Sequence, residues 1–134
     1  MKNELKCTDL RIGNYVLFNN VRCKIAEIER DRVVIEYHNG DTDYYYIYYI
    51  DPIELTEEML KKIGFEKDGN NYSLVCGDIE VGFYIDNFKQ VLYINVSREK
   101  RFYKNELRSY DVKYLHQLQN TYHTLTGKEL EVEL

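Results

Sequence analysis

Histidine, cysteine and carboxylate side chains are the groups in this sequence that could bind a metal ion or attack a substrate. His116 and His123 lie seven residues apart in a stretch with helical periodicity. Two histidines on one helix chelate a metal at a spacing of four residues, whereas seven residues separate them by about 10 Å along the axis. We therefore expect these histidines, with Gln119 and Asn120, to form a polar stripe that packs or hydrogen bonds at the helix edge, and no metal site.

Catalysis by a cysteine nucleophile would need a histidine beside a thiol with a lowered pKa. The three cysteines, Cys7, Cys23 and Cys76, show no CxxC spacing, and no local motif joins them to a histidine. We expect reduced thiols of a cytoplasmic protein, with Cys23 and Cys76 in apolar strand patterns and Cys7 exposed. The GxGxxG, GxxxxGK[ST], HExxH and GxSxG motifs are absent, so the sequence predicts no catalytic residue, no cofactor and no enzyme.

The most unusual stretch is a run of tyrosines at 43–50, DYYYIYYI, in a chain with 14 tyrosines. In a strand, alternate side chains point to opposite faces, and Ile47 indicates the inward face. The inward set is then Tyr45, Ile47 and Tyr49. The outward set is Tyr44, Tyr46 and Tyr48. Two explanations stay open for the outward row, namely β-propensity with cross-strand packing or a contact surface for a protein partner, for which these three tyrosines are the candidate residues.

A second candidate surface is a basic stretch within an acidic chain, whose net charge is −5. Residues 98–113 hold six basic and three acidic side chains, with aromatic residues among them. Such a stretch is either a solvated loop or a site whose basic side chains bind phosphates and whose aromatic rings stack on a base. The candidate residues for binding a nucleic acid or nucleotide are Arg98, Lys100, Arg101, Phe102, Tyr103, Lys104 and Arg108.

The elements that must position these residues begin with a small antiparallel sheet in a first subdomain, residues 1–54. Alternating strand patterns separated by turn residues cover 10–18, 21–29, 32–38 and 43–50. The first pattern is interrupted by Gly13-Asn14, which predicts a sharp bend, and the second slips near Ala26. Short strands with tight turns predict an SH3-like small barrel.

The second subdomain, residues 55–134, is predicted to be α+β and to form one compact unit with the first. Thr56 as N-cap, Glu57 and Glu58 in the first turn, and Gly64 after the last turn indicate a short helix. A three-stranded meander, a long helix and a terminal strand follow. The predicted bounds are helix 56–63, strands 71–76, 79–85 and 90–96, helix 112–126 and strand 129–134.

Three stretches, LRIGNYV at 10–16, PIELTEEMLKKIGFEK at 52–67 and VKYLHQLQNTYHTLTGKEL at 112–130, carry a resemblance over nearly the full length. The chain resembles a family of small uncharacterised proteins of gut anaerobes, their phages and other mobile elements. The family brings no established activity, so no residue role is carried over. The resemblance implies a cytoplasmic, phage-associated protein with an interaction or counter-defence role.

These observations predict a non-enzymatic binding protein that acts by protein–protein contact. The alternative is binding of a nucleic acid or nucleotide through the small barrel and the basic loop 98–108. No stretch approaches the roughly 18 apolar residues of a membrane span, and no apolar run behind a basic start indicates a signal peptide. We therefore expect no membrane association, and the sequence leaves the oligomeric state open, a homodimer included.

Overall fold

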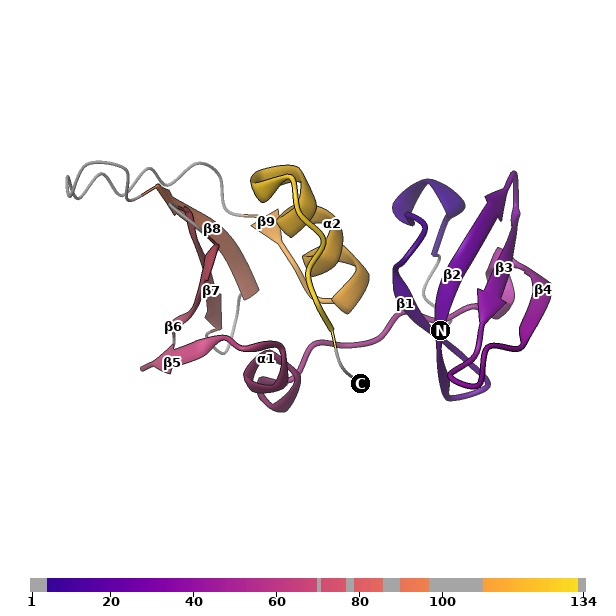
Figure 1. Cartoon of the computed structure of the whole chain (residues 1–134), viewed down its shortest axis with the longest axis horizontal. Helices are drawn as coiled ribbons and strands as arrows, with labels where there is room; N and C mark the ends of the chain where they lie inside the picture. Colours follow the sequence, from indigo (N-terminus) through magenta and orange to yellow (C-terminus); the bar gives the residue numbers. More distant parts are fainter. Residues whose placement is uncertain (1–4, 70, 77–78, 86–89, 97–109, 133–134) are drawn as a thin grey trace. The chain divides into compact units, whose positions relative to one another are not determined.

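A computed structural model of the chain describes residues 5–69, 71–76, 79–85, 90–96 and 110–132. The chain divides into two compact units. Unit 1 comprises Met1–Glu54 and Tyr114–Asn120, and unit 2 comprises Leu55–Lys113 and Thr121–Leu134. Antiparallel sheets and helices make the fold α+β (Figure 1). Among the described residues, no helix is long and apolar enough to cross a membrane.

Unit 1 is built on a four-stranded antiparallel sheet with the strand order β1-β2-β3-β4. Its elements are a 3-10 turn η1 (Cys7–Asp9), β1 (Tyr15–Phe18), β2 (Val21–Glu29), β3 (Arg32–Glu36) and β4 (Thr42–Tyr46). Asn19 and Asn20 have φ angles of 48° and 62°, which suit a two-residue hairpin turn between β1 and β2. Gly13, at φ 97°, makes the predicted bend before β1, and the register of β2 shifts between Ile25 and Glu27 as predicted.

The sheet of unit 1 is open. β4 pairs with β3 only, and the predicted small barrel is not confirmed because no sheet closes. The predicted strand 43–50 is also too long, since β4 ends at Tyr46 and a 3-10 turn η2 (Ile47–Tyr49) follows. Beyond η2, Asp51 exchanges two backbone hydrogen bonds of 2.8 and 2.9 Å with Leu17 of β1, as a single bridge.

The core of unit 1 consists of apolar side chains from the inner face of the sheet and its flanking turns. The buried members are Leu10, Val16, Cys23, Ile25, Val33, Ile35 and Ile50. Burial raises the pKa of the Cys23 thiol to about 11, as is typical of an inert core cysteine. Cys7 was predicted to be exposed but is half-buried, because η1 folds it against this core.

Unit 2 begins with α1 (Glu57–Ile63), whose ends follow the capping residues that the sequence contains. The Thr56 hydroxyl accepts a hydrogen bond of 3.2 Å from the Met59 N–H. At the other end Gly64 has a φ of 115°, and the Phe65 N–H donates to the Leu60 carbonyl at 3.0 Å. This is the Schellman ending, which satisfies carbonyls that the last turn leaves unpaired.

The sheet of unit 2 is five-stranded and antiparallel, in the order β5-β6-β7-β8-β9. Its strands are β5 (Glu66–Asp68), β6 (Asn71–Cys76), β7 (Ile79–Ile85), β8 (Gln90–Val96) and β9 (Tyr110–Asp111). β6, β7 and β8 have the bounds that alternation predicts, whereas β5 and β9 were not predicted. These two strands are short, at three and two residues, and such short stretches carry too little alternation to be recognised.

The long helix α2 (Leu115–Thr126) starts three residues later than the predicted residue 112. The segment before it is extended, because the Lys113 carbonyl accepts from the Leu55 N–H and the Ile53 carbonyl accepts from the Leu115 N–H. Asp111 is therefore the last residue of β9 and lies outside the helix. The predicted strand 129–134 is wrong over 129–132, which pairs with no strand. The alternating pattern there reflects the burial of Leu130. A strand also needs a neighbouring strand to pair with, and the pattern does not show whether one is present.

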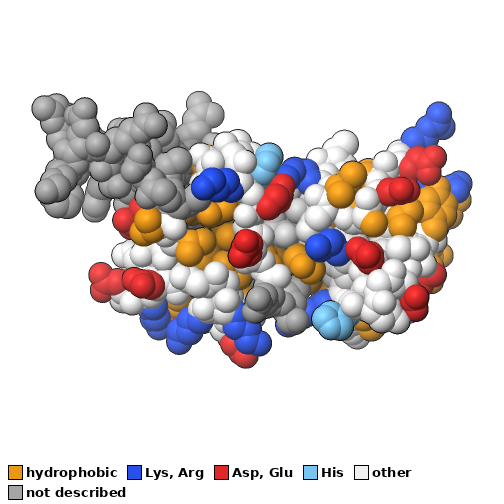
Figure 2. All heavy atoms as spheres, viewed as in Figure 1, with side chains coloured by type: hydrophobic (Ala, Val, Ile, Leu, Met, Phe, Trp, Pro, Cys, Tyr) orange, Lys and Arg blue, Asp and Glu red, His pale blue; other side chains and the backbone are white. Residues whose placement is uncertain are grey.

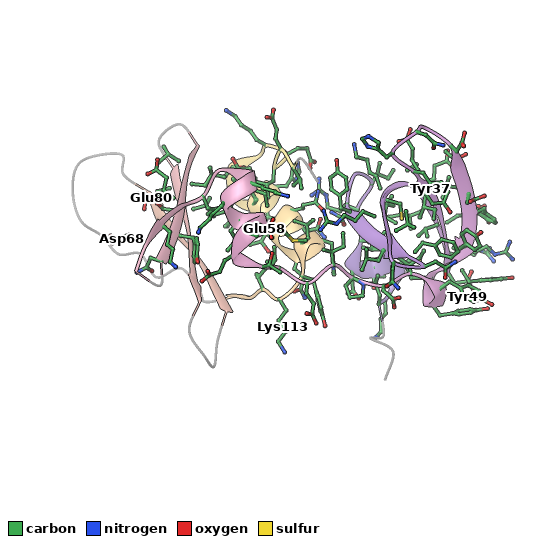
Figure 3. The ribbon with its side chains drawn as sticks, turned by 90° about the horizontal axis from the view of Figure 1, so that it is seen from below. Tyr37, Tyr49, Glu58, Asp68, Glu80 and Lys113 are labelled. Carbon is green, nitrogen blue, oxygen red and sulfur yellow. The ribbon has the colours of Figure 1, made fainter. Side chains whose placement is uncertain are left out.

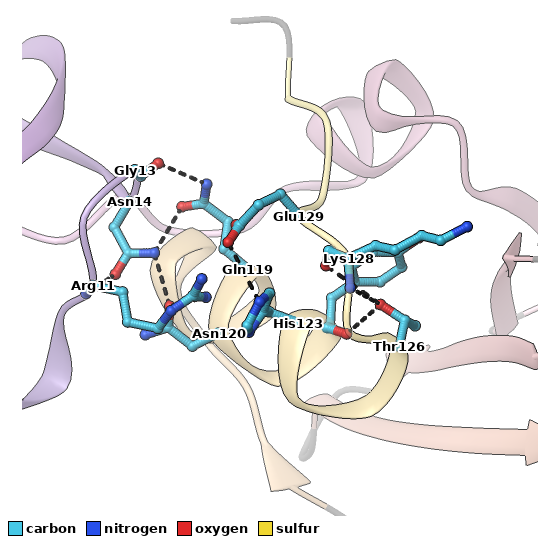
Figure 4. Close-up of polar contacts among 10 residues, drawn as sticks. Arg11, Gly13, Asn14, Gln119, Asn120, His123, Thr126, Lys128 and Glu129 are labelled. Carbon is cyan, nitrogen blue, oxygen red and sulfur yellow. Dashed lines mark hydrogen bonds and ion pairs between the residues drawn. The ribbon is translucent and has the colours of Figure 1, made fainter.

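Within unit 1, polar residues of α2 bind the backbone of the bend before β1 (Figure 4). Gln119 is buried; its side-chain oxygen accepts from the Tyr15 N–H at 2.9 Å and its amide donates to the Gly13 carbonyl at 3.2 Å. The buried Asn14 side chain accepts from the Arg11 N–H at 2.7 Å and donates to Asn120 at 2.8 Å. The predicted polar stripe is thus confirmed for Gln119 and Asn120, which hold this bend in place.

Replacing Gln119 with leucine should destabilise the protein by about 1–3 kcal/mol, because two partly buried backbone groups would lose their side-chain partners. Urea denaturation measures the change in the free energy of unfolding. The control is Gln117→Leu, since Gln117 is only half-buried and accepts from the Tyr114 N–H, at 3.1 Å, on its own helix end. Equal losses for the two variants would contradict a special role for Gln119.

His116, on the same helix, is buried and neutral. Its side chain is 2% exposed, its ring stacks on Tyr114 at 5.9 Å, and its Nδ1 has no hydrogen-bond partner. Burial lowers the pKa of His116 to about 4, against the opposing influence of Asp9. The unfolded chain therefore takes up a proton at a higher pH than the folded chain does.

Stability should accordingly fall as the pH drops from about 6.5 towards 4, by up to about 3 kcal/mol from His116, and this group should contribute no further loss below that range. The variant His116→Gln should flatten this part of the curve of unfolding free energy against pH. His38→Gln, at an exposed site, is the control for the effect of the substitution itself. An unchanged slope in His116→Gln would refute the assignment.

Candidate functional site

Four exposed tyrosines gather at the end of β4 and in the turn that follows it. The exposed fractions are 46% for Tyr44, 36% for Tyr46, 56% for Tyr48 and 49% for Tyr49. Tyr44 and Tyr46 point outward as alternation predicts. Tyr45 points inward and stacks on Phe18 with a centroid distance of 4.1 Å. We refer to Tyr44, Tyr46, Tyr48 and Tyr49 as the tyrosine surface.

The turn η2 brings the last two of these rings together. A strand would have sent Tyr48 outward and Tyr49 inward, so the prediction of an inward Tyr49 is wrong. The 3-10 turn leaves both side chains exposed, and Tyr49 lies at the surface among other rings (Figure 3). Tyr46 and Tyr48 stack at 5.5 Å with an interplanar angle of 8°, and Tyr48 lies 4.5 Å from Tyr49 at 43°. Tyr46, Tyr48 and Tyr49 therefore form a contiguous set in which the first two rings are stacked.

Arg32 supports the tyrosine surface from the neighbouring strand. The register places Arg32 opposite Tyr46, with its guanidinium carbon 4.6 Å from the ring centroid of Tyr46 and 5.5 Å from that of Tyr44. Its Nη1 donates to the Tyr44 hydroxyl at 3.4 Å, and that hydroxyl donates to Glu29 at 3.0 Å. The hydrogen bond with Tyr44 raises the pKa of Arg32, so the cation is permanent.

The sequence did not single out Arg32, although the signal was present. Arg30-Asp31 is a two-residue turn, and it makes Arg32 the first residue of β3, opposite Glu29. Counting outward from the turn at Asn39-Gly40 then brings Arg32 opposite Tyr46. Pairing the predicted strands in this way, rather than considering each strand alone, would have found the contact.

An open hollow lies beside the tyrosine surface, at the turn between β2 and β3. It is lined by Glu29, Arg30, Asp31, Arg32 and Tyr44. Arg30 has a φ of 53°, and Arg32 and Asp31 form an ion pair at 4.0 Å. Two basic and two acidic side chains leave this hollow without net charge. Figure 2 shows hydrophobic side chains next to both acidic and basic ones over the part of unit 1 that carries β3 and β4.

This arrangement suits binding rather than bond making. The pKa of Tyr48 is raised by hydrogen bonding with Tyr49 and by burial, so its phenol stays protonated near neutral pH. Tyrosine and arginine are enriched in the energetically dominant parts of protein interfaces, because their side chains combine apolar area with hydrogen-bonding groups. In the part of the chain that the structure describes, no group of three His, Cys, Asp or Glu residues could hold a metal ion.

The second predicted site, the basic loop, lies outside the described residues. All seven candidates fall within 97–109, namely Arg98, Lys100, Arg101, Phe102, Tyr103, Lys104 and Arg108. Their role in binding a nucleic acid or nucleotide stays a prediction. No protein-family model, curated protein or solved structure matches this chain. The candidate site therefore rests on the geometry of unit 1.

Replacing Arg32 with methionine should loosen the rings of Tyr44 and Tyr46 while the sheet stays folded, because the apolar stem remains and only the cation is lost. NMR relaxation of ring carbons in the full chain measures this as increased ring motion. The control is Lys24→Met, which removes a cation 5.4 Å from Tyr15 on the same sheet. Unchanged motion of both rings in Arg32→Met would show that Arg32 does not order them.

Proposed function

We propose that this protein binds a protein partner through the tyrosine surface and performs no catalysis. The main support is that the four rings are half-exposed and held together: Tyr46 stacks on Tyr48, Tyr49 lies tilted against Tyr48, and Arg32 contacts both Tyr44 and Tyr46. Single exposed tyrosines are common, whereas an ordered set loses little conformational entropy when a partner covers it. Its rings are therefore preorganised for contact.

The charges around the rings add support to protein binding. Glu29, Asp31, Arg30 and Arg32 balance one another beside the rings, so the surface neither attracts nor repels a partner by net charge. A nucleic-acid surface would instead carry an excess of basic side chains to neutralise phosphates. The alternative function, binding through loop 98–108, concerns residues outside the described part and stays a separate prediction.

We also propose a setting for this function. In the first unit, the bridge between Asp51 and Leu17 follows a 3-10 turn after β4, which supports a half-open, SH3-like sheet. The resemblance to proteins of gut anaerobes and their phages supports a cytoplasmic accessory or counter-defence factor of a mobile element. In that setting the partner would be a host protein.

The test compares partner capture by the wild-type chain and by the triple variant Tyr44→Ala, Tyr46→Ala, Tyr48→Ala. Host proteins retained by the wild type are identified by mass spectrometry, purified, and titrated by calorimetry. We expect the triple variant to bind the purified partner at least about 100-fold more weakly, because loss of central tyrosines at an interface costs several kcal/mol.

The matched control is Ile12→Ala with Val21→Ala, which removes exposed apolar side chains of unit 1 outside the tyrosine surface. The control should bind as the wild type does, and circular dichroism melts should show that all variants are folded. Affinity of the triple variant within twofold of wild type would refute the proposed function.

A further inference from the structure

The strand that carries the tyrosines is also a free edge of its sheet. β4 (Thr42–Tyr46) is the last strand in the order β1-β2-β3-β4, and among the residues that the structure describes it pairs on one side only, with β3. Its sequence, TDYYY, contains no lysine and no proline, and its register with β3 is continuous without a bulge. Lysine, proline and bulges are three of the devices by which natural sheets prevent an edge from pairing with another chain. β4 has none of these three, and its one charged residue is Asp43.

The register shows which backbone groups lie on that edge. The Tyr37 N–H donates to the Asp41 carbonyl and the Ile47 N–H donates to the Asp31 carbonyl, both at 2.8 Å. In an antiparallel ladder such bonds recur at every second residue, so within β4 the residues that bond to β3 are Asp43 and Tyr45. The N–H and C=O groups of the intervening residues point away from β3. These residues are Thr42, Tyr44 and Tyr46.

Most of these edge groups have no other partner within the part of the chain that the structure describes. No backbone or side-chain hydrogen bond reaches the N–H groups of Thr42, Tyr44 and Tyr46, or the C=O groups of Thr42 and Tyr44, from outside the ladder, whereas the Tyr46 carbonyl starts the 3-10 turn η2. The side chains of Tyr44 and Tyr46 belong to the tyrosine surface. One strand thus presents exposed rings and a row of open hydrogen-bonding groups together.

The size of this surface favours a short segment over a second folded copy. A fully covered tyrosine buries about 150–250 Å², so four half-exposed rings offer roughly 400 Å². A stable complex of two folded proteins buries about 800 Å² on each partner. An extended peptide can instead gain affinity from backbone hydrogen bonds along the edge, with side chains in contact on alternate positions.

The neighbouring side chains define the chemistry of that segment. A strand added to β4 would place one set of alternate side chains beside Tyr44 and Tyr46, where apolar or aromatic groups fit best. Its other set would lie beside Asp43, which is exposed, as is Asp41 at the start of the strand. β4 itself contains no basic residue, so a lysine or arginine facing Asp43 would meet no opposing cation on this strand.

We propose that β4 accepts an extended segment of the partner protein as a fifth strand of the sheet in unit 1. The segment alternates apolar or aromatic residues, which contact Tyr44 and Tyr46, with a basic residue facing Asp43. This inference rests on the proposed function, because it names the way in which the partner contacts the tyrosine surface. It adds that backbone groups of Thr42, Tyr44 and Tyr46 take part.

The first test uses a capped nine-residue synthetic peptide that alternates valine and lysine, titrated into the isotopically labelled full chain. Amide hydrogen exchange of Thr42, Tyr44 and Tyr46 should slow by at least about tenfold on saturation, because these amides gain acceptors. The amides of Asp43 and Tyr45, already bonded within the ladder, should change much less. The control peptide carries N-methyl groups on the amides that would face β4, and it should give no protection.

The second test uses the partner captured by the wild-type chain. Thr42→Pro removes one outward N–H but no ring, and it leaves the ladder to β3 intact because the Thr42 N–H is not used there. It should weaken partner binding about tenfold, while the matched variant Thr42→Val should stay within twofold of wild type. The peptide experiment on wild-type protein remains decisive if Thr42→Pro does not fold.

The outcomes separate the two proposals. If the tyrosine variants lose the partner while Thr42→Pro keeps it, and no alternating protection develops at about 1 mM peptide, the rings bind without strand addition and the inference is overturned. If the tyrosine variants also keep the partner, the proposed function fails too. Concentration-dependent protection of the same amides without peptide would identify a second copy as the occupant and would likewise overturn the inference.

Discussion

The register between β3 and β4 is the constraint on which the candidate site depends. It brings Arg32 opposite Tyr46 and places Tyr44 within reach of both Arg32 and Glu29. A shift by one residue would turn Tyr44 and Tyr46 into the core and send Tyr45 away from Phe18. The same register selects which amides of β4 lie on the free edge. The register thus determines both the side chains and the backbone groups that this site presents.

The inner face of the sheet explains why this register is stable. Val33 and Ile35 of β3 are fully buried, and Tyr45 packs over Phe18 on the same side. A shifted pairing would expose these side chains to solvent and would therefore be less stable. On the outer face, Arg32 and the tyrosines contribute less to stability because they remain partly in solvent. The buried face fixes the geometry, and the exposed face is left for contact.

The sequence predicted those parts of the fold that depend on local signals. The capping residues Thr56 and Gly64 gave the bounds of α1 to within one residue, and alternation gave β6 to β8. Prediction from local signals failed where hydrogen bonds to backbone far away in the sequence determine the conformation. Residues 112–114 look helical by periodicity, but Lys113 is held in an extended segment by Leu55. Alternation at 129–132 likewise could not show that no strand edge is available there.

Only part of the candidate site was predicted, because the rest depends on contacts between residues that are far apart in the sequence. Alternation identified Tyr44 and Tyr46, whereas the turn η2 redirected the chain and exposed Tyr49 as well. Arg32 lies twelve residues from Tyr44 in sequence, and only strand pairing brings the two together. Polar residues on α2 were expected at a helix edge, but the sequence did not indicate that Gln119 would bind the bend before β1.

An open strand edge also has a cost for the protein that carries it. Unpaired N–H and C=O groups beside aromatic rings can recruit any unfolded or misfolded chain that meets them, and such contacts start aggregates. The chain has a net charge of −5, and mutual repulsion between copies is a general defence against this. Solubility of the protein should therefore decline as the pH approaches its isoelectric point near 5.2, where that repulsion vanishes.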